Sequence, residues 1–108
     1  MPEQNMRGWN TSNVTNMSSI FESASSFNQD IGGWDTSNVT DMSYMFSEAS
    51  SFNQDLSKWN LLRIQDLTDI FIDSGMSKEN YCKLFSGTSS AIWSAYKDNL
   101  SISYDCSN

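Results

Sequence analysis

The chain has 108 residues, a formal net charge of −7 and no histidine. Its length allows one small domain with a modest core, and its negative charge argues against binding to nucleic acid or to an anionic membrane surface. The lack of histidine excludes a Ser-His-Asp or Cys-His catalytic arrangement, and no apolar run is long enough to span a bilayer, so we predict no enzyme activity, no cofactor and no membrane span.

A repeat of 25 residues occupies the first two thirds of the chain. The stretches Trp9–Ile31 and Trp34–Leu56 are identical at 16 of 23 aligned positions, and a degenerate third copy begins at Trp59. Apolar residues recur at the same step in all three copies and form three columns: Trp9, Trp34 and Trp59; Phe21, Phe46 and Phe71; Met17, Met42 and Leu67. Such a period predicts repeats that stack, because each unit alone cannot bury its apolar face.

Each repeat is predicted to contain one short helix and one short strand. In the second copy, Met42, Met45, Phe46 and Ala49 have the i, i+3, i+4, i+7 spacing of one helical face. The stretch 52–59 places apolar residues around polar ones and is expected to pair in parallel with its neighbours. We therefore predict an α/β repeat solenoid with one short parallel strand and one short helix in each 25-residue repeat.

The wording of the two full copies, "WNTSNVTNMSSIFESASSFNQDI" and "WDTSNVTDMSYMFSEASSFNQDL", resembles a tandem repeat of bacterial surface proteins. That repeat, of about 25 residues, occurs in surface lipoproteins and is related to BspA-like leucine-rich repeats. The resemblance covers roughly residues 5–75. It implies right-handed coils of the leucine-rich-repeat type, a location outside the cell or on its surface with any signal or lipid anchor outside this chain, and a role in adhesion or protein recognition. It implies no catalytic residues.

The sequence changes character after Ser74. Residues 75–108 contain two helical stripes, so we divide the chain into repeats over 1–74 and a C-terminal helical cap over 75–108. A cap is expected because the open end of a repeat array exposes its apolar columns. Cys82 and Cys106 form either a single disulfide, as in small exported domains, or two unrelated buried thiols.

Polar residues that recur in both full copies are the candidate binding site. They are Asn28, Gln29, Asp30, Asn53, Gln54 and Asp55. Side chains along one face of stacked repeats would form a small acidic recognition surface. The alternative is that these residues only satisfy neighbouring repeats, because a specific site normally varies from one repeat to the next.

Two further rows of side chains offer other kinds of binding. The Trp column is a sugar-stacking platform if it is exposed, although its survival in the degenerate copy favours burial. The Thr and Asn residues of the "TSNVT" turns resemble an ice-binding face. However, the pattern occurs in only two copies, and so short a row matches the ice lattice poorly. The aspartates lack the loop spacing of a calcium site, so no metal is predicted.

We therefore predict a non-catalytic cell-surface or secreted interaction or adhesion module that presents its repeats for protein recognition. The alternative is a carbohydrate- or ice-type surface binder that uses the Trp or Thr/Asn rows. The expected partner is a protein or a glycan at a cell surface. End-to-end self-association through the N-terminal coil is a further expectation, because that coil has no neighbour before it.

Overall fold

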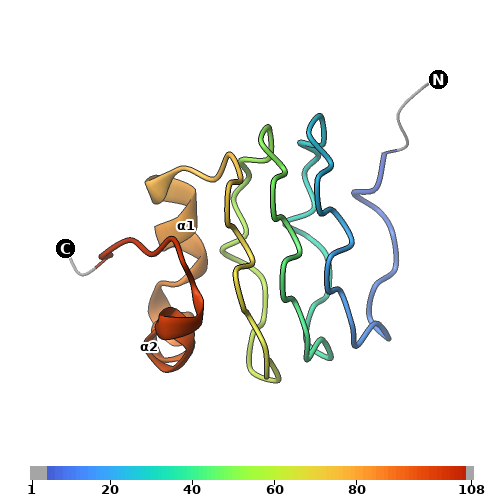
Figure 1. Ribbon diagram of the computed structural model, residues 1–108. Coiled ribbons are helices and arrows are strands. Elements are labelled where there is room, and N and C mark those ends of the chain that lie inside the picture. The colour runs from blue at the N-terminus through green and yellow to red at the C-terminus, as the bar shows by residue number, and fades with distance from the viewer. Residues whose placement is uncertain (1–4, 107–108) are drawn as a thin grey trace.

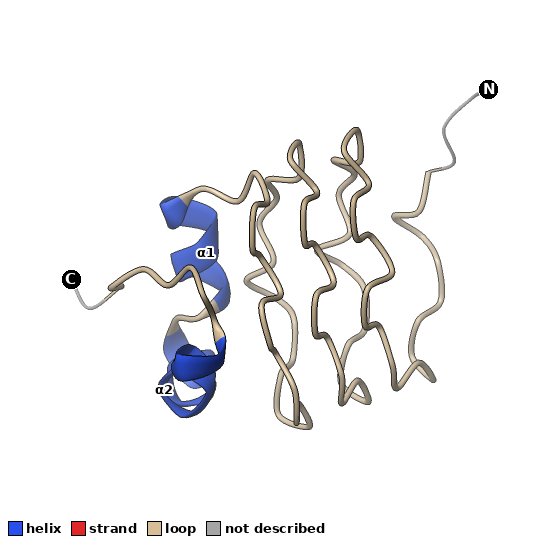
Figure 2. Cartoon of the chain, viewed as in Figure 1, coloured by secondary structure: helices blue, strands red, loops and turns tan. Residues whose placement is uncertain are grey.

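The fold consists of irregular repeats that lie side by side, followed by two short helices. The computed structural model describes residues 5–106 (Figure 1), so the ends of the two predicted units, residues 1–4 and 107–108, lie outside the described residues. The helices are α1, Lys78–Leu84, and α2, Ser90–Tyr96. Two short 3-10 helices flank α2, at Gly87–Ser89 and Lys97–Asn99. Figure 2 shows the repeats as loop throughout, with both helices at the C-terminal end.

The prediction of an α/β solenoid with right-handed leucine-rich-repeat coils is wrong. Over residues 5–106 the structure contains no strand, and neither α-helix lies within a repeat. Isolated parallel bridges join Asn16 to Asp41 and Asp41 to Asp66, without extending into a sheet. The molecule is instead a small globule with a Cα radius of gyration of 12.9 Å, built mainly from turns.

Left-handed backbone conformations explain why the predicted helices do not form. Tyr44 and Glu48 have φ angles of 56° and 59°. The equivalent residues of the other two repeats are also left-handed: Ser19, Ser23, Asp69 and Asp73. An α-helix needs consecutive right-handed residues, so only single turns remain, such as the 3.2 Å bond from the Met45 N–H to the Met42 carbonyl.

In residues 17–23 of the first repeat and 42–48 of the second, the N–H of every second residue donates to a backbone carbonyl of the next repeat. The first repeat donates to the second at 2.7–3.0 Å, from Met17 to Asp41, Ser19 to Ser43, Phe21 to Met45 and Ser23 to Ser47. The second donates to the third at 2.9 Å, from Met42 to Asp66, Tyr44 to Thr68, Phe46 to Ile70 and Glu48 to Ile72. All these peptide groups therefore direct their N–H toward the C-terminal end of the molecule and their carbonyl toward the N-terminal end.

The predicted strand is absent because side chains replace the backbone ladder there. The Asn53 N–H donates to the Asn28 side-chain oxygen at 2.9 Å, and no backbone-to-backbone bond joins this part of the two repeats within the described residues. An extended segment without such a ladder is not part of a sheet. The asparagine that recurs in the two full copies, Asn28 and Asn53, thus joins neighbouring segments where a sheet was expected.

Apolar side chains of successive repeats pack against one another in the core. The Phe21 and Phe46 ring centroids lie 5.7 Å apart, and those of Phe46 and Phe71 lie 5.6 Å apart. Met17, Met42 and Leu67 are buried. The Trp column differs along its length, because Trp34 and Trp59 are 5% and 3% exposed whereas Trp9 is 49% exposed.

The C-terminal segment covers the third repeat. The Ser77 side chain accepts the Asn80 N–H at 3.1 Å and so caps the start of α1. Tyr81 of this helix is buried and packs edge-on against Phe71, with ring centroids 6.1 Å apart. A disulfide joins Cys82 of α1 to Cys106, the pair given as a disulfide candidate, with a Cα–Cα distance of 5.5 Å.

Candidate functional site

The asparagines of the predicted binding set are engaged between repeats. The Asn28 side-chain oxygen accepts the Asn53 N–H and the Gln54 amide, both at 2.9 Å. One repeat further, the Asn53 side-chain oxygen accepts the Ser77 N–H at 3.0 Å and the Asn80 amide at 2.9 Å. These contacts follow the alternative stated above, in which recurring amides satisfy the neighbouring repeat.

The two aspartates of the set lie at turns and accept backbone N–H groups there. Asp30 accepts the Gly32 N–H at 3.1 Å, and Asp55 accepts the Ser57 N–H at 2.9 Å. The second carboxylate oxygen of Asp30 lies 3.4 Å from the Arg7 guanidinium. These carboxylates therefore differ, because in the described residues Asp30 has an ion-pair partner and Asp55 has none within 4.0 Å.

Hydrogen bonding also sets the charge of Asp55. Its bonds with the Ser57 side chain and backbone N–H hold the pKa of the carboxyl below its ordinary value. The positive charges of Lys83 and Lys58 act in the same direction, while desolvation opposes them. The carboxylate thus remains ionised at neutral pH and below it, and it loses its charge only when the pH falls through the lowered pKa.

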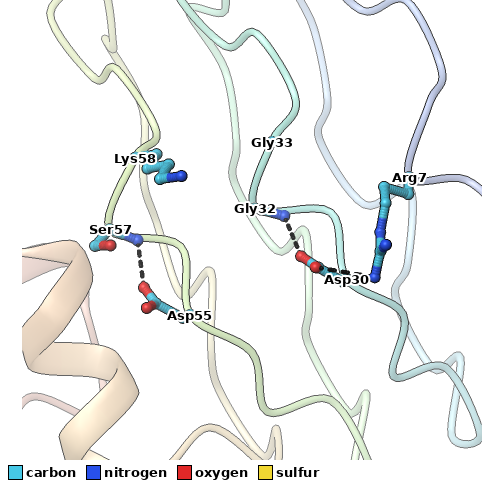
Figure 3. Close-up of a pocket in the computed structure, with 7 residues that line it drawn as sticks. All are labelled: Arg7, Asp30, Gly32, Gly33, Asp55, Ser57 and Lys58. Atoms are coloured by element: carbon cyan, nitrogen blue, oxygen red, sulfur yellow. Dashed lines mark hydrogen bonds and ion pairs between the residues drawn. The ribbon is translucent and has the colours of Figure 1, made fainter.

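A shallow groove of about 400 Å³ connects these turns, as Figure 3 shows. Its lining residues are Arg7, Asp30, Gly32, Gly33, Asp55, Ser57 and Lys58. Arg7 and Lys58 stand on opposite sides of the pair Gly32 and Gly33, which has no side chains to fill the space between them. The groove therefore presents cations and carboxylates from three successive repeats to solvent.

The groove is one of the places where the repeats differ in chemistry. Apart from Asp30 and Asp55, its lining residues come from one dipeptide that is Arg-Gly at positions 7–8, Gly-Gly at 32–33 and Ser-Lys at 57–58. Sequence reasoning predicted Asp30 and Asp55 but missed Arg7, Gly32 and Lys58. The signal was available, because this dipeptide directly follows the apolar residue that ends each repeat and changes every time.

This arrangement supports recognition and shows no reactive constellation. Side chains of opposite charge on an open groove suit ion pairs and hydrogen bonds to another molecule. Within residues 5–106, no group of three or more acidic, cysteine or histidine side chains is placed to hold a metal ion. None of the helices in this part of the chain is long and apolar enough to cross a membrane.

The close approach at Gly32 gives a test of the groove's architecture. A Cβ at position 32 would lie 2.5 Å from the Asp55 carbonyl oxygen, whereas one at Gly33 would meet no atom within 4 Å. We expect Gly32→Ala to lower the free energy of unfolding by about 1–3 kcal/mol through this overlap. Gly33→Ala is the matched control and should change it by less than about 0.5 kcal/mol in urea unfolding. Equal stability of the two variants would contradict the close approach.

Most of the Trp and Thr rows is engaged between repeats, although Trp9 is 49% exposed and Thr15 is also exposed. The indole N–H groups of Trp34 and Trp59 donate to the carbonyls of Met6 and Ile31, at 2.8 and 3.0 Å. Thr11 and Thr36 are buried, and their hydroxyls donate to backbone carbonyls of the following repeat at 3.0 and 3.1 Å. Both rows therefore serve contacts between repeats.

Together these features define a small tandem-repeat protein whose repeats are joined by backbone and amide hydrogen bonds and followed by a short helical segment. The family described as "Mycoplasma protein of unknown function, DUF285" matches residues 2–90, and the chain belongs to this family. The match supports the predicted membership of a repeat family, but it shows no relation to leucine-rich repeats. No curated protein and no solved structure matches the chain.

Proposed function

We propose that the protein is a non-catalytic interaction or adhesion module, located at the cell surface or secreted, which binds a protein partner through the groove around Gly32 and Gly33. The observation that carries the proposal is the variation of the groove from repeat to repeat. Specific recognition requires distinct groups at distinct places, and the recurring amides cannot supply them because they are engaged between repeats.

The free charges of the groove indicate what the partner presents. Asp55 and Lys58 are exposed, and neither forms an ion pair within 4.0 Å in the described part of the chain. A partner segment with one basic and one acidic side chain would pair with both. Such contacts give specificity and speed association more than they add affinity, which suits an adhesion module that acts through many copies.

The disulfide supports the proposed location. A bond between Cys82 and Cys106 persists in oxidising surroundings, and such bonds are rare in the reducing cytosol. Small exported domains commonly need a covalent link because their cores are small. The alternative of a carbohydrate- or ice-type binder has no comparable support, since its Trp and Thr rows lie mostly between repeats.

The groove can be filled without disturbing the fold. Gly33→Gln places a side chain into open space, and Gly8→Gln is the matched control because Gly8 is the equivalent residue one repeat earlier and also has no atom near its Cβ position. The wild-type protein is first screened against immobilised host surface proteins and glycans. For a protein that it binds, we expect Gly33→Gln and Lys58→Glu each to weaken the affinity by about tenfold or more, and Gly8→Gln to leave it unchanged.

Two outcomes would reject this function. Equal binding by the wild type and Gly33→Gln would place the partner elsewhere on the molecule. Binding only to glycans, unaffected by Lys58→Glu, would favour the carbohydrate reading over protein recognition. Turnover of any glycan in the screen would show that the protein is not a passive binder.

A further inference from the structure

A second cavity adjoins the groove described above, on the side of the C-terminal segment. It has a volume of about 320 Å³ and is lined by residues 57–62, where the third repeat begins, and by side chains within residues 86–92. Ser57 and Lys58 line both cavities, so the two hollows meet at these residues. The Tyr96 hydroxyl at the end of α2 donates to a backbone carbonyl of the third repeat at 3.0 Å. This bond holds the two walls of the second cavity together.

An exposed leucine lines this second cavity. Leu62 is 73% exposed, the largest exposed fraction of any large apolar side chain in the described residues. Its neighbour Leu61 is 1% exposed and belongs to the core. The equivalents of Leu62 in the first two repeats are Ser12 and Ser37, whose hydroxyls each bond to the side chain two residues earlier. Packing within the chain therefore explains the leucine at position 61 but not the one at position 62.

The two cavities present three kinds of chemical group in a fixed order. Asp55 lines only the first cavity, Lys58 lines both, and Leu62 lines only the second. Neither Asp55 nor Lys58 forms an ion pair within 4.0 Å in the described part of the chain, and Figure 3 shows both side chains beside the groove. An acidic, a basic and an apolar group thus follow one another along the surface.

We propose that this surface binds an extended segment of the partner protein that carries a basic, an acidic and an apolar side chain in that order. The inference rests on the proposed function and extends it, because the groove supplies the two charged contacts and the second cavity adds an apolar anchor. The basic group pairs with Asp55, the acidic group pairs with Lys58, and the apolar side chain packs against Leu62 and Ile92. The charged pairs set the orientation of the segment, while burial of the leucine supplies affinity.

The chemistry of the second cavity favours a peptide over a glycan as the occupant. Trp59, an aromatic residue that lines this cavity, is 3% exposed, so it presents no ring face on which a sugar could stack. A carboxylate, an ammonium group and an aliphatic side chain are instead complemented by amino-acid side chains. Because an extended chain advances about 3.3 Å per residue, three such side chains with short spacers between them reach along both cavities.

The probe is a set of synthetic peptides with arginine, glutamate and phenylalanine in this order, separated by short glycine spacers of varied length and made in both chain directions. Each is titrated into the isotope-labelled full chain and followed by NMR. We expect at least one peptide to bind with a dissociation constant below about 1 mM and to shift the amide signals of residues 57–62. The matched control has the same composition with arginine and glutamate exchanged, and it should bind at least about tenfold more weakly.

Variants of the chain locate the apolar anchor. Leu62→Ser should weaken peptide binding by about tenfold without unfolding the chain, because serine occupies this turn position in the first two repeats. Ile102→Ser is the matched control, since Ile102 is 41% exposed but lines neither cavity, and it should leave binding unchanged. Absence of binding by every peptide at about 1 mM, equal binding of the exchanged peptide, or indifference to Leu62→Ser would each overturn the inference.

The same variants separate a failure of this inference from a failure of the proposed function. Peptide binding that Gly33→Gln removes and Leu62→Ser does not would keep the groove and reject the apolar anchor. Binding that Leu62→Ser removes and Gly33→Gln does not would reject the groove, and the proposed function with it. If no peptide binds, the inference fails, while the screen against surface proteins still decides the proposed function.

Discussion

Replacing Phe46 with alanine is expected to lower the free energy of unfolding by about 3–5 kcal/mol, the range for a fully buried phenylalanine. The Phe46 ring has no solvent exposure. It stacks on Phe52 at a centroid distance of 4.0 Å and lies between Phe21 and Phe71 at 5.7 and 5.6 Å. Its removal leaves a cavity shared by three repeats, which cannot close because hydrogen bonds fix the spacing between them.

Urea unfolding followed by circular dichroism measures this effect. Asp55→Ala is the comparison, because that substitution removes an exposed turn contact, the 2.9 Å bond from the Ser57 N–H, from a neighbouring part of the same repeat. We expect it to cost about 1 kcal/mol or less. A larger loss from Asp55→Ala than from Phe46→Ala would show that the turns, and not the aromatic column, carry most of the stability.

The repeat could be predicted from the sequence because residues 25 positions apart are identical or similar. The prediction of secondary structure failed because side-chain spacing does not report backbone handedness. Met42, Met45 and Phe46 reach the core from consecutive turns as readily as from a helix. The deciding feature is the left-handed conformation of Tyr44 and Glu48, and these residue types give no sign of it, since left-handed positions favour glycine or asparagine.

Part of the candidate groove was missed for a related reason. Asn28 and Asn53 recur in both full copies, and each bonds to the segment that follows one repeat later. Arg7 and Lys58 do not recur, and only the three-dimensional alignment of the repeats brings them to the same groove. In a repeat protein, polar residues that recur are better candidates for contacts between repeats, and those that vary are better candidates for binding.

The two ends of the row of repeats differ in how their backbone hydrogen bonds are satisfied. Each repeat must give its outward N–H groups to one neighbour and its carbonyls to the other. At the C-terminal end, part of this requirement is met by Asn99 and by the cover of α1. At the N-terminal edge, the carbonyls of Asn16, Ser18, Ile20 and Glu22 accept no hydrogen bond from the described residues.

Reduction of the bond between Cys82 and Cys106 is expected to destabilise the protein by about 3 kcal/mol, because the bond closes a loop with a sequence separation of 24 in the unfolded chain. For a domain of this size, the melting temperature should fall by about 10 °C or more. Thermal unfolding with and without a thiol reductant measures the shift, and the double variant Cys82→Ser/Cys106→Ser should reproduce it. An unchanged melting temperature in both experiments would show that the bond adds nothing to stability.

The loss should begin in the C-terminal segment, because the disulfide holds the tail against α1. Tyr104 in that tail packs edge-on against Tyr81 at a centroid distance of 5.0 Å, and the Tyr81 hydroxyl accepts the Trp93 indole N–H at 2.8 Å. Release of the tail loosens this cluster while the hydrogen bonds between repeats persist. Iodide should then quench Trp93 more strongly after reduction, whereas the buried Trp34 and Trp59 remain protected until the repeats unfold. Replacing Trp93 with phenylalanine should remove the change in quenching, which identifies its source.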